Sequence, residues 1–130
     1  MNEKINWVLN VQVVGGPVIS ESKTIEIDAY DKIDVVIDDG STDKEVQVQP
    51  ASTGIQFLMI KTDNYGDKLK YKVNDGTSST SDIVLDSPVH LFIGSGAIGL
   101  LGKAPVKFLF SNSLGKNAAV KILVGRDATP

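Results

Sequence analysis

One glycine pattern in the sequence could bind a dinucleotide. Residues 94–99 read Gly-Ser-Gly-Ala-Ile-Gly, which matches G-x-G-x-x-G, and they follow an apolar run. This pattern works when it opens a long helix whose N-terminus holds a pyrophosphate, with a carboxylate about 20 residues further on for the ribose. Here Gly102 and Pro105 stop any helix, and no Asp or Glu follows before Asp127. We therefore expect an apolar loop at 94–99, and no cofactor.

The densest group of carboxylates is Asp38, Asp39, Asp43 and Glu45. Oxygen ligands of this kind suit Ca²⁺, but their spacing fits no D-x-D-x-D-G loop with a distal Glu. A solvated hairpin turn accounts for them equally well. A glycosidase needs two carboxyl groups about 5–10 Å apart, and no pair here stands out from the other acids. We expect no metal site.

His90 is the only histidine, and the chain has no cysteine. One histidine without cysteine cannot build a zinc site of the usual kind. The sequence also lacks the G-x-S-x-G turn that would present a serine nucleophile. His90 is therefore expected to serve in packing or in an interface. We identify no catalytic residue and expect that the chain is not an enzyme.

Alternation of apolar and polar residues, the period of a β-strand, runs through most of the chain. The apolar positions fall in ten short segments: 5–13, 25–27, 33–37, 46–48, 55–59, 69–73, 83–85, 89–93, 106–110 and 120–124. Turn residues such as Gly15-Gly16-Pro17 separate several of them, and no segment has a helical period. The expected fold is all-β: one antiparallel, jelly-roll-like β-sandwich of about ten short strands spanning 1–130. Trp7 and Tyr71 are in phase with the apolar positions, so we expect both in the core.

Charge and hydropathy limit the partners. The net charge is −3 and Arg126 is the only arginine, which argues against nucleic acid. No run approaches the ~20 apolar residues of a membrane span, and Met1–Asn10 lacks the apolar stretch of a signal peptide. We expect a protein made in the cytoplasm, with no membrane partner.

Charge is also distributed unevenly along the chain. Residues 1–86 hold fifteen carboxylates against eight lysines, whereas residues 87–125 hold four lysines and no carboxylate. If the fold sends these segments to different surfaces, opposite charges could meet between subunits and orient them.

Some strands are apolar on both faces, which a two-layered sandwich cannot bury by itself. Loops or another subunit must cover the remainder, and large exposed apolar patches usually mark interfaces. The residues that we predict for an interface between copies of this chain are Leu58, Ile60, Phe92, Ile98, Leu100, Leu101 and Leu123.

Two closing segments carry a family resemblance. The segments are 105–113 (Pro-Val-Lys-Phe-Leu-Phe-Ser-Asn-Ser) and 119–127 (Ala-Val-Lys-Ile-Leu-Val-Gly-Arg-Asp). Together they resemble the C-terminal hairpin of small all-β virion proteins of tailed bacteriophages. The cysteine-free, Gly/Ser/Thr-rich style of the chain is similar to those proteins too. The likeness covers about the last quarter of the chain and includes no diagnostic motif.

The resemblance implies a structural virion protein that decorates or cements a phage capsid. Its partners would be its own copies, as a homo-oligomer such as a trimer, and a major capsid or other virion protein. The alternative is a carbohydrate-binding or host-recognition β-sandwich without catalytic activity. Tyr30 and Tyr65, both in turns, are the rings available to stack on a sugar.

Overall fold

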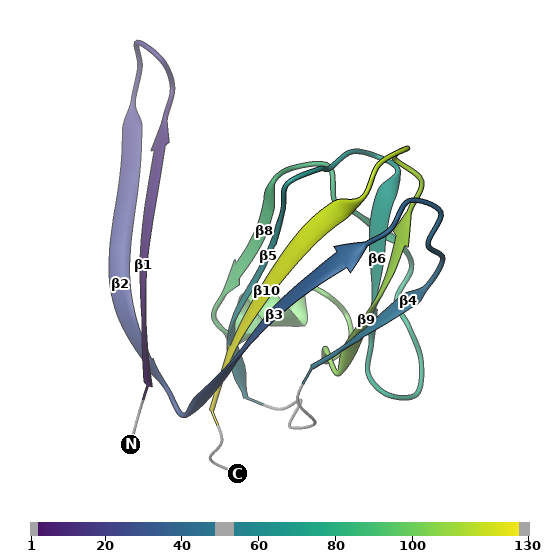
Figure 1. Cartoon of the computed structure of the whole chain (residues 1–130). Helices are drawn as coiled ribbons and strands as arrows, with labels where there is room; N and C mark the ends of the chain where they lie inside the picture. Colours follow the sequence, from purple (N-terminus) through teal and green to yellow (C-terminus); the bar gives the residue numbers. More distant parts are fainter. Residues whose placement is uncertain (1–2, 49–53, 128–130) are drawn as a thin grey trace.

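The computed structural model of the chain describes residues 3–48 and 54–127, which form ten β-strands and one short helix (Figure 1). The first two strands are β1 (Glu3–Gln12) and β2 (Val18–Ile27). They are followed by β3 (Ala29–Ile37), β4 (Lys44–Gln47), β5 (Ile55–Thr62), β6 (Leu69–Asn74), β7 (Ile83–Val84), β8 (Val89–Ile93), α1 (Ser95–Gly99), β9 (Lys107–Asn112) and β10 (Ala118–Arg126).

The eight strands from β3 to β10 form a body of two sheets. One sheet has the order β3-β10-β5-β8 and the other has the order β4-β9-β6-β7. All pairs are antiparallel, and the pairing is nested along the chain: β3 with β10, β4 with β9, β5 with β8 and β6 with β7. The body is therefore an antiparallel β-sandwich, which confirms the all-β class and the number of strands expected from the alternation.

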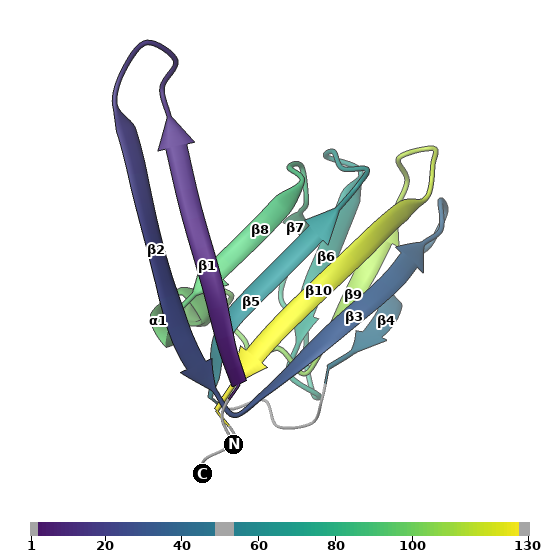
Figure 2. The same ribbon diagram turned by 60° about the vertical axis from the view of Figure 1, so that its left-hand side comes forward.

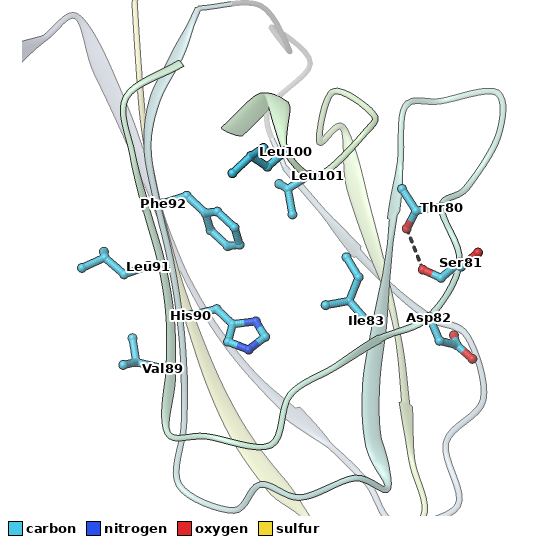
Figure 3. Close-up of a pocket in the computed structure, with 10 residues that line it drawn as sticks. All are labelled: Thr80, Ser81, Asp82, Ile83, Val89, His90, Leu91, Phe92, Leu100 and Leu101. Atoms are coloured by element: carbon cyan, nitrogen blue, oxygen red, sulfur yellow. Dashed lines mark hydrogen bonds between the residues drawn. The ribbon is translucent and has the colours of Figure 1, made fainter. Parts of the chain in front are cut away.

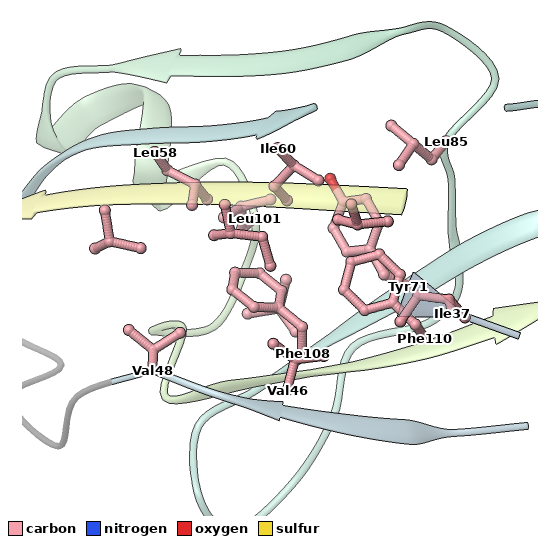
Figure 4. Close-up of a cluster of buried hydrophobic side chains, with 14 of the residues drawn as sticks. Ile37, Val46, Val48, Leu58, Ile60, Tyr71, Leu85, Leu101, Phe108 and Phe110 are labelled. Carbon is pink, nitrogen blue, oxygen red and sulfur yellow. The ribbon is translucent and has the colours of Figure 1, made fainter. Parts of the chain in front are cut away.

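The core lies between the two sheets and has aromatic rings at its centre (Figure 4). Tyr71, Phe108 and Phe110 are fully buried, and the ring of Tyr71 lies 5.9 Å from that of Phe108 and 5.6 Å from that of Phe110. Aliphatic side chains of the other sheet, including Ile122, pack over these rings. Full burial of one such side chain stabilises the fold by about 1.5–3 kcal/mol. The core positions expected for β6, β9 and β10 are thus confirmed.

Two neighbouring strands turn the opposite face to the core from the one expected. In β5, Leu58 and Ile60 point inward and are fully buried, while Met59 is only half-buried. Met59 lies opposite Leu91 in the β5–β8 pair, and Ile60 lies opposite His90. Because opposite residues of an antiparallel pair share a face, the two strands are necessarily reversed together. Both are apolar on each face, so their alternation alone could not choose between the faces.

The first two strands do not join the body. β1 and β2 pair with each other from Glu3 opposite Ile27 to Gln12 opposite Val18, and form a sheet of their own. We call this hairpin, residues 3–27, the arm. Figure 2 shows it rooted near the end of β10 and rising away from the sheet that contains β8. The expectation that Trp7 belongs to the core is wrong, because the core cluster includes no residue of the arm.

The root of the arm packs on the outer face of the sheet at Gly125. A Cβ atom at this position would lie 2.7 Å from Cδ1 of Ile5 and 3.1 Å from Cδ1 of Ile27. Gly125 lies opposite Phe57 in β5, and Phe57 is only 3% exposed although it is outside the core cluster. The absence of a side chain at Gly125 therefore lets the arm lie against the sheet and helps to cover Phe57.

Replacing Gly125 with valine should lift the root of the arm from the sheet. The φ angle of Gly125 is not positive, so the backbone accepts valine, but the added methyl groups would meet Ile5 and Ile27. Overpacking of this kind costs roughly 1–3 kcal/mol. Trp7 is the only tryptophan, so its fluorescence reports on the root. We expect Gly125→Val to shift the emission to the red and to increase quenching by iodide.

The matched control is Ala119→Val, on the outer face of the same strand. Ala119 is exposed, so a larger side chain there meets no part of the arm. Its emission should equal that of the wild type. Equal red shifts in both variants would contradict the docking of the root at Gly125.

Candidate functional site

The arm carries an apolar surface that the described part of the chain leaves uncovered. Seven aliphatic side chains of the arm are more than two-fifths exposed. They are Val8 (79%), Leu9 (42%), Val11 (51%), Val13 (60%), Val14 (97%), Val18 (55%) and Ile19 (69%). A two-stranded hairpin is at best marginally stable in water by itself, and an apolar patch of this kind usually marks an interface.

The two faces of the arm differ in polarity. The odd-numbered residues share one face, where Val11 lies opposite Ile19. The even-numbered residues share the other face, where Asn10 lies opposite Ser20. Most of the apolar side chains belong to the odd-numbered face, which we call the inner face because its root contacts the body.

Exposure along the inner face increases from root to tip. Ile27 is 1% exposed and Ile5 is half-buried, whereas Leu9 is 42% and Ile19 is 69% exposed. The arm therefore diverges from the sheet, as Figures 1 and 2 both show. Near the root, the indole Nε1 of Trp7 is buried and has no hydrogen-bond partner among the described residues. An unpaired buried donor costs about 1–3 kcal/mol.

The sheet beside the arm also exposes apolar side chains on its outer face. Leu123, Met59 and Leu91 lie opposite one another across β10, β5 and β8, and we call them the outer row. Leu91 is 38% exposed, and the other two are half-buried. Next to the outer row, Lys121 lies opposite Lys61, and both are exposed. Like charges in directly opposite positions repel. Lys121 also lies opposite Asp34 of β3, whereas Lys61 has Val89 on its other side, so an added carboxylate would be most favourable at Lys61.

Four of the seven residues predicted for an interface lie inside the chain. Leu58, Ile60, Ile98 and Leu101 are at most 8% exposed and belong to the core cluster. The prediction that they meet a partner is therefore wrong. The reversed phase of β5 places the first two in the core, and α1 with the residues after it covers one end of the sandwich.

The other three predicted residues differ among themselves. Phe92 points into the sandwich and is half-buried, Leu123 belongs to the outer row, and Leu100 is 83% exposed. Leu100 and Leu123 thus have side-chain surface that is accessible to solvent, and their role in an interface stays a prediction. The sheet does have an apolar outer face, but Met59 and Leu91, neighbours of the residues chosen, form much of it.

Sequence reasoning missed the arm as a separate element. Its signal is the alternation on both sides of Gly15-Gly16-Pro17, which reads as two long strands joined by a turn. The alternation of residues does not show which surface covers the apolar face of this hairpin. The alternation alone therefore predicts a core strand here, whereas the core cluster includes no residue of the arm.

A groove of about 630 Å³ opens along the side of the sandwich between β7 and β8 (Figure 3). Ile83 faces His90 and Phe92 across it, and Leu101 lies at one end. Leu91 points away on the other side of β8, which again shows the phase of this strand. The groove is large enough for a small ligand, and six of its ten lining residues are apolar.

His90 takes part in a hydrogen bond between the two sheets. Its Nδ1 lies 2.8 Å from the hydroxyl oxygen of Tyr71. Burial raises the pKa of Tyr71, so the hydroxyl keeps its proton near pH 7. Burial lowers the pKa of His90, against a smaller opposite effect of the Asp86 carboxylate. The imidazole is therefore neutral near pH 7.

Residues 94–99 contain one turn of helix rather than the expected loop. α1 has five residues and follows Gly94, whose φ is 92°. The strands on either side, β8 and β9, belong to different sheets, so this segment is not part of a βαβ unit. The arrangement that a dinucleotide requires is thus missing at this place.

The acidic segment 38–45 connects the two sheets, so the expectation of a hairpin turn is wrong. Asp43 forms an ion pair of 3.3 Å with Lys72, and Glu45 pairs with Lys107. In residues 3–48 and 54–127, no three His, Asp or Glu side chains are grouped so that they could hold a metal ion.

The charged halves of the sequence do not form separate surfaces. β8 and β10 alternate with β3 and β5 in one sheet, and β9 lies between β4 and β6 in the other. Lys103 and Lys107 of the basic segment pair with Asp75 and Glu45 of the acidic one, within one chain. The same topology overturns the C-terminal hairpin implied by the resemblance, because β9 and β10 belong to different sheets.

The two tyrosines considered for sugar stacking lie toward opposite ends of the sheet. Tyr30 is opposite Gly125, whereas Thr62, shortly before Tyr65, is opposite Val120. Five residues along a strand span about 16 Å. These two rings therefore do not form one stacking platform.

Fold and surface together define a β-sandwich with a projecting two-stranded arm. Comparison of the chain with protein-family models, with curated proteins and with solved structures found no match. Across the described residues, no helix is both long enough and apolar enough to span a bilayer.

The stability of the fold should fall as His90 is protonated. The folded chain lowers the pKa of His90 below its ordinary value of 6.5, so the unfolded chain binds the proton more readily. The stabilisation is therefore present above that value and is lost as the pH falls through the pKa of the folded state. We expect the urea midpoint to fall between about pH 7.5 and about pH 5, and to fall less in His90→Gln. Parallel curves for the two proteins would refute this.

Proposed function

We propose that this chain is a structural protein that assembles with copies of itself through the arm. The observation that carries the proposal is the uncovered apolar inner face of the arm. Leu9, Val11 and Ile19 lie on this face beyond the part that the body covers. A second chain would supply the cover that the first chain lacks.

The free energy gained by covering the arm is similar in size to the lower end of the free-energy cost of association. Four of the seven exposed aliphatic side chains are odd-numbered (Leu9, Val11, Val13 and Ile19), and covering what they expose offers on the order of 5 kcal/mol per arm. Association costs about 4–15 kcal/mol in lost freedom. For one arm, the gain from burial thus roughly equals the lower end of the cost of association. A closed assembly that covers an arm on every subunit would be stable.

We also propose that the assembly belongs to a bacteriophage virion, where it decorates or cements the capsid as a homo-oligomer such as a trimer. The nested order β3-β10-β5-β8 over β4-β9-β6-β7 supports a jelly roll, an architecture used in capsid and lectin domains. This support is an analogy of fold. The partner would be a major capsid or other virion protein.

Replacing Val11 with lysine together with Ile19 with glutamate should convert the oligomer into monomers. The two residues are directly opposite, so the new charges pair across the hairpin and keep it folded while the inner face loses two aliphatic side chains. We expect a loss of about 2–4 kcal/mol of association energy per arm. Light scattering coupled to size-exclusion chromatography measures the change.

The control is Asn10→Lys with Ser20→Glu, the neighbouring pair on the other face. It introduces the same charges and removes no aliphatic side chain, so the oligomer should persist. A wild-type chain that is monomeric up to roughly 100 μM would contradict assembly through the arm. Immunogold labelling of intact phage particles with an antibody to this chain tests the virion role, and unlabelled capsids would oppose it.

A further inference from the structure

We infer that the arm of one copy lies with its inner face on the outer row of a second copy. This inference rests on the proposed self-assembly and names the surface that receives the arm. The outer row, Leu123, Met59 and Leu91, is the exposed apolar part of the sheet next to the arm's own root.

The root of the arm already shows this mode of packing within one chain. Ile5 and Ile27 of the inner face rest on the outer face of the same sheet at Gly125. The outer row begins one step further along the strands, since Leu123 and Gly125 are alternate residues of β10. A second arm on the outer row would extend an existing contact with the same residue types.

The charges of the two surfaces also match. Glu21 is the carboxylate on the distal part of the inner face, where it lies opposite Leu9, and Lys23, opposite Trp7, follows on the same face toward the root. Lys61 and Lys121 are adjacent, exposed like charges directly beside the outer row. An arm placed on that row brings the carboxylate toward this pair, in which Lys121 already lies opposite Asp34 and Lys61 lies opposite Val89. Charge pairs of this kind fix the orientation of an interface.

Reciprocity favours a second copy as the occupant. Each chain exposes both an inner face and an outer row, so two chains related by a twofold axis can each give one arm and receive one. Two arms are then covered at once, which doubles the buried apolar area for a single cost of association. A ring of three chains passing their arms in one direction satisfies the same pairs.

The sequence has no cysteine, so introduced thiols are unique. One population of full-length chains carries Leu9→Cys, and a second population with a size tag carries Leu91→Cys. After mixing and exchange of subunits, a short bismaleimide should link the two populations into a heterodimer on a denaturing gel. Because each chain holds one thiol, every link joins two chains.

Val84→Cys replaces Leu91→Cys as the control. Val84 lies on β7 in the other sheet and is 37% exposed, against 38% for Leu91. The Val84→Cys and Leu9→Cys chains should form no more heterodimer than the same two chains form when both are unfolded. Equal linking of Leu91→Cys and Val84→Cys would overturn the inference.

A charge exchange tests the same contact without thiols. Glu21→Lys and Lys121→Glu should each weaken association about tenfold, and the chain with both changes should recover most of the loss. Lys70→Glu, a lysine on the sheet that does not receive the arm, should have little effect. If the affinity losses of Glu21→Lys and Lys121→Glu simply add in the chain with both changes, the pairing of Glu21 with the lysines is contradicted.

The outcomes separate this inference from the proposed function. An oligomer that is lost on Val11→Lys/Ile19→Glu but gives no Leu9–Leu91 link keeps the proposed function and overturns the acceptor surface. One chain that carries both Leu9→Cys and Leu91→Cys serves as a further test: a link that forms within the monomer shows the arm folding onto its own sheet, which overturns the inference. A wild-type monomer at all concentrations overturns both.

Discussion

The constraint on which the rest depends is that a two-stranded hairpin has an apolar face and nothing of its own to cover it. A sandwich solves this problem by placing two sheets face to face, and β3 to β10 do so around Tyr71, Phe108 and Phe110. The arm has no second sheet. Its root packs on the outer face of the body at Gly125, and beyond the root its aliphatic side chains are exposed to solvent.

That constraint joins features that are far apart in sequence. β5, β8 and β10 are apolar on both faces and lie together in one sheet, so the surplus is concentrated on the outer face nearest the arm. In the other sheet, Lys70 and Lys72 alternate with the core residues of β6. In the proposed assembly, the two uncovered surfaces cover each other. The body then acts as a rigid platform, and the arm supplies the contact.

The sequence predicts the β-sandwich well because alternation reports directly on one-sided burial. The core positions of 69–73, which alternate with lysines, are predicted correctly, and β6 extends one residue further to Asn74. The phase of 55–59 is wrong because both faces are apolar, and only the pairing with β8 decides between them. The arm is missed for a different reason: its alternation is that of a core strand, and the missing second layer is a property of the tertiary structure. The wrong phase of 55–59 also explains Leu58 and Ile60, two of the residues predicted for an interface, which lie on the face of their sheet that is turned to the core.

The most direct test of the account is amide hydrogen exchange of residues 5–25, measured above and below the concentration at which the oligomer dissociates. If a second chain covers the arm, its amides are protected in the oligomer and exchange rapidly in the monomer, while the amides of β6 and β9 stay protected in both. If the arm amides are equally protected in the dilute monomer, the arm is stable without a partner, and the central claim is wrong.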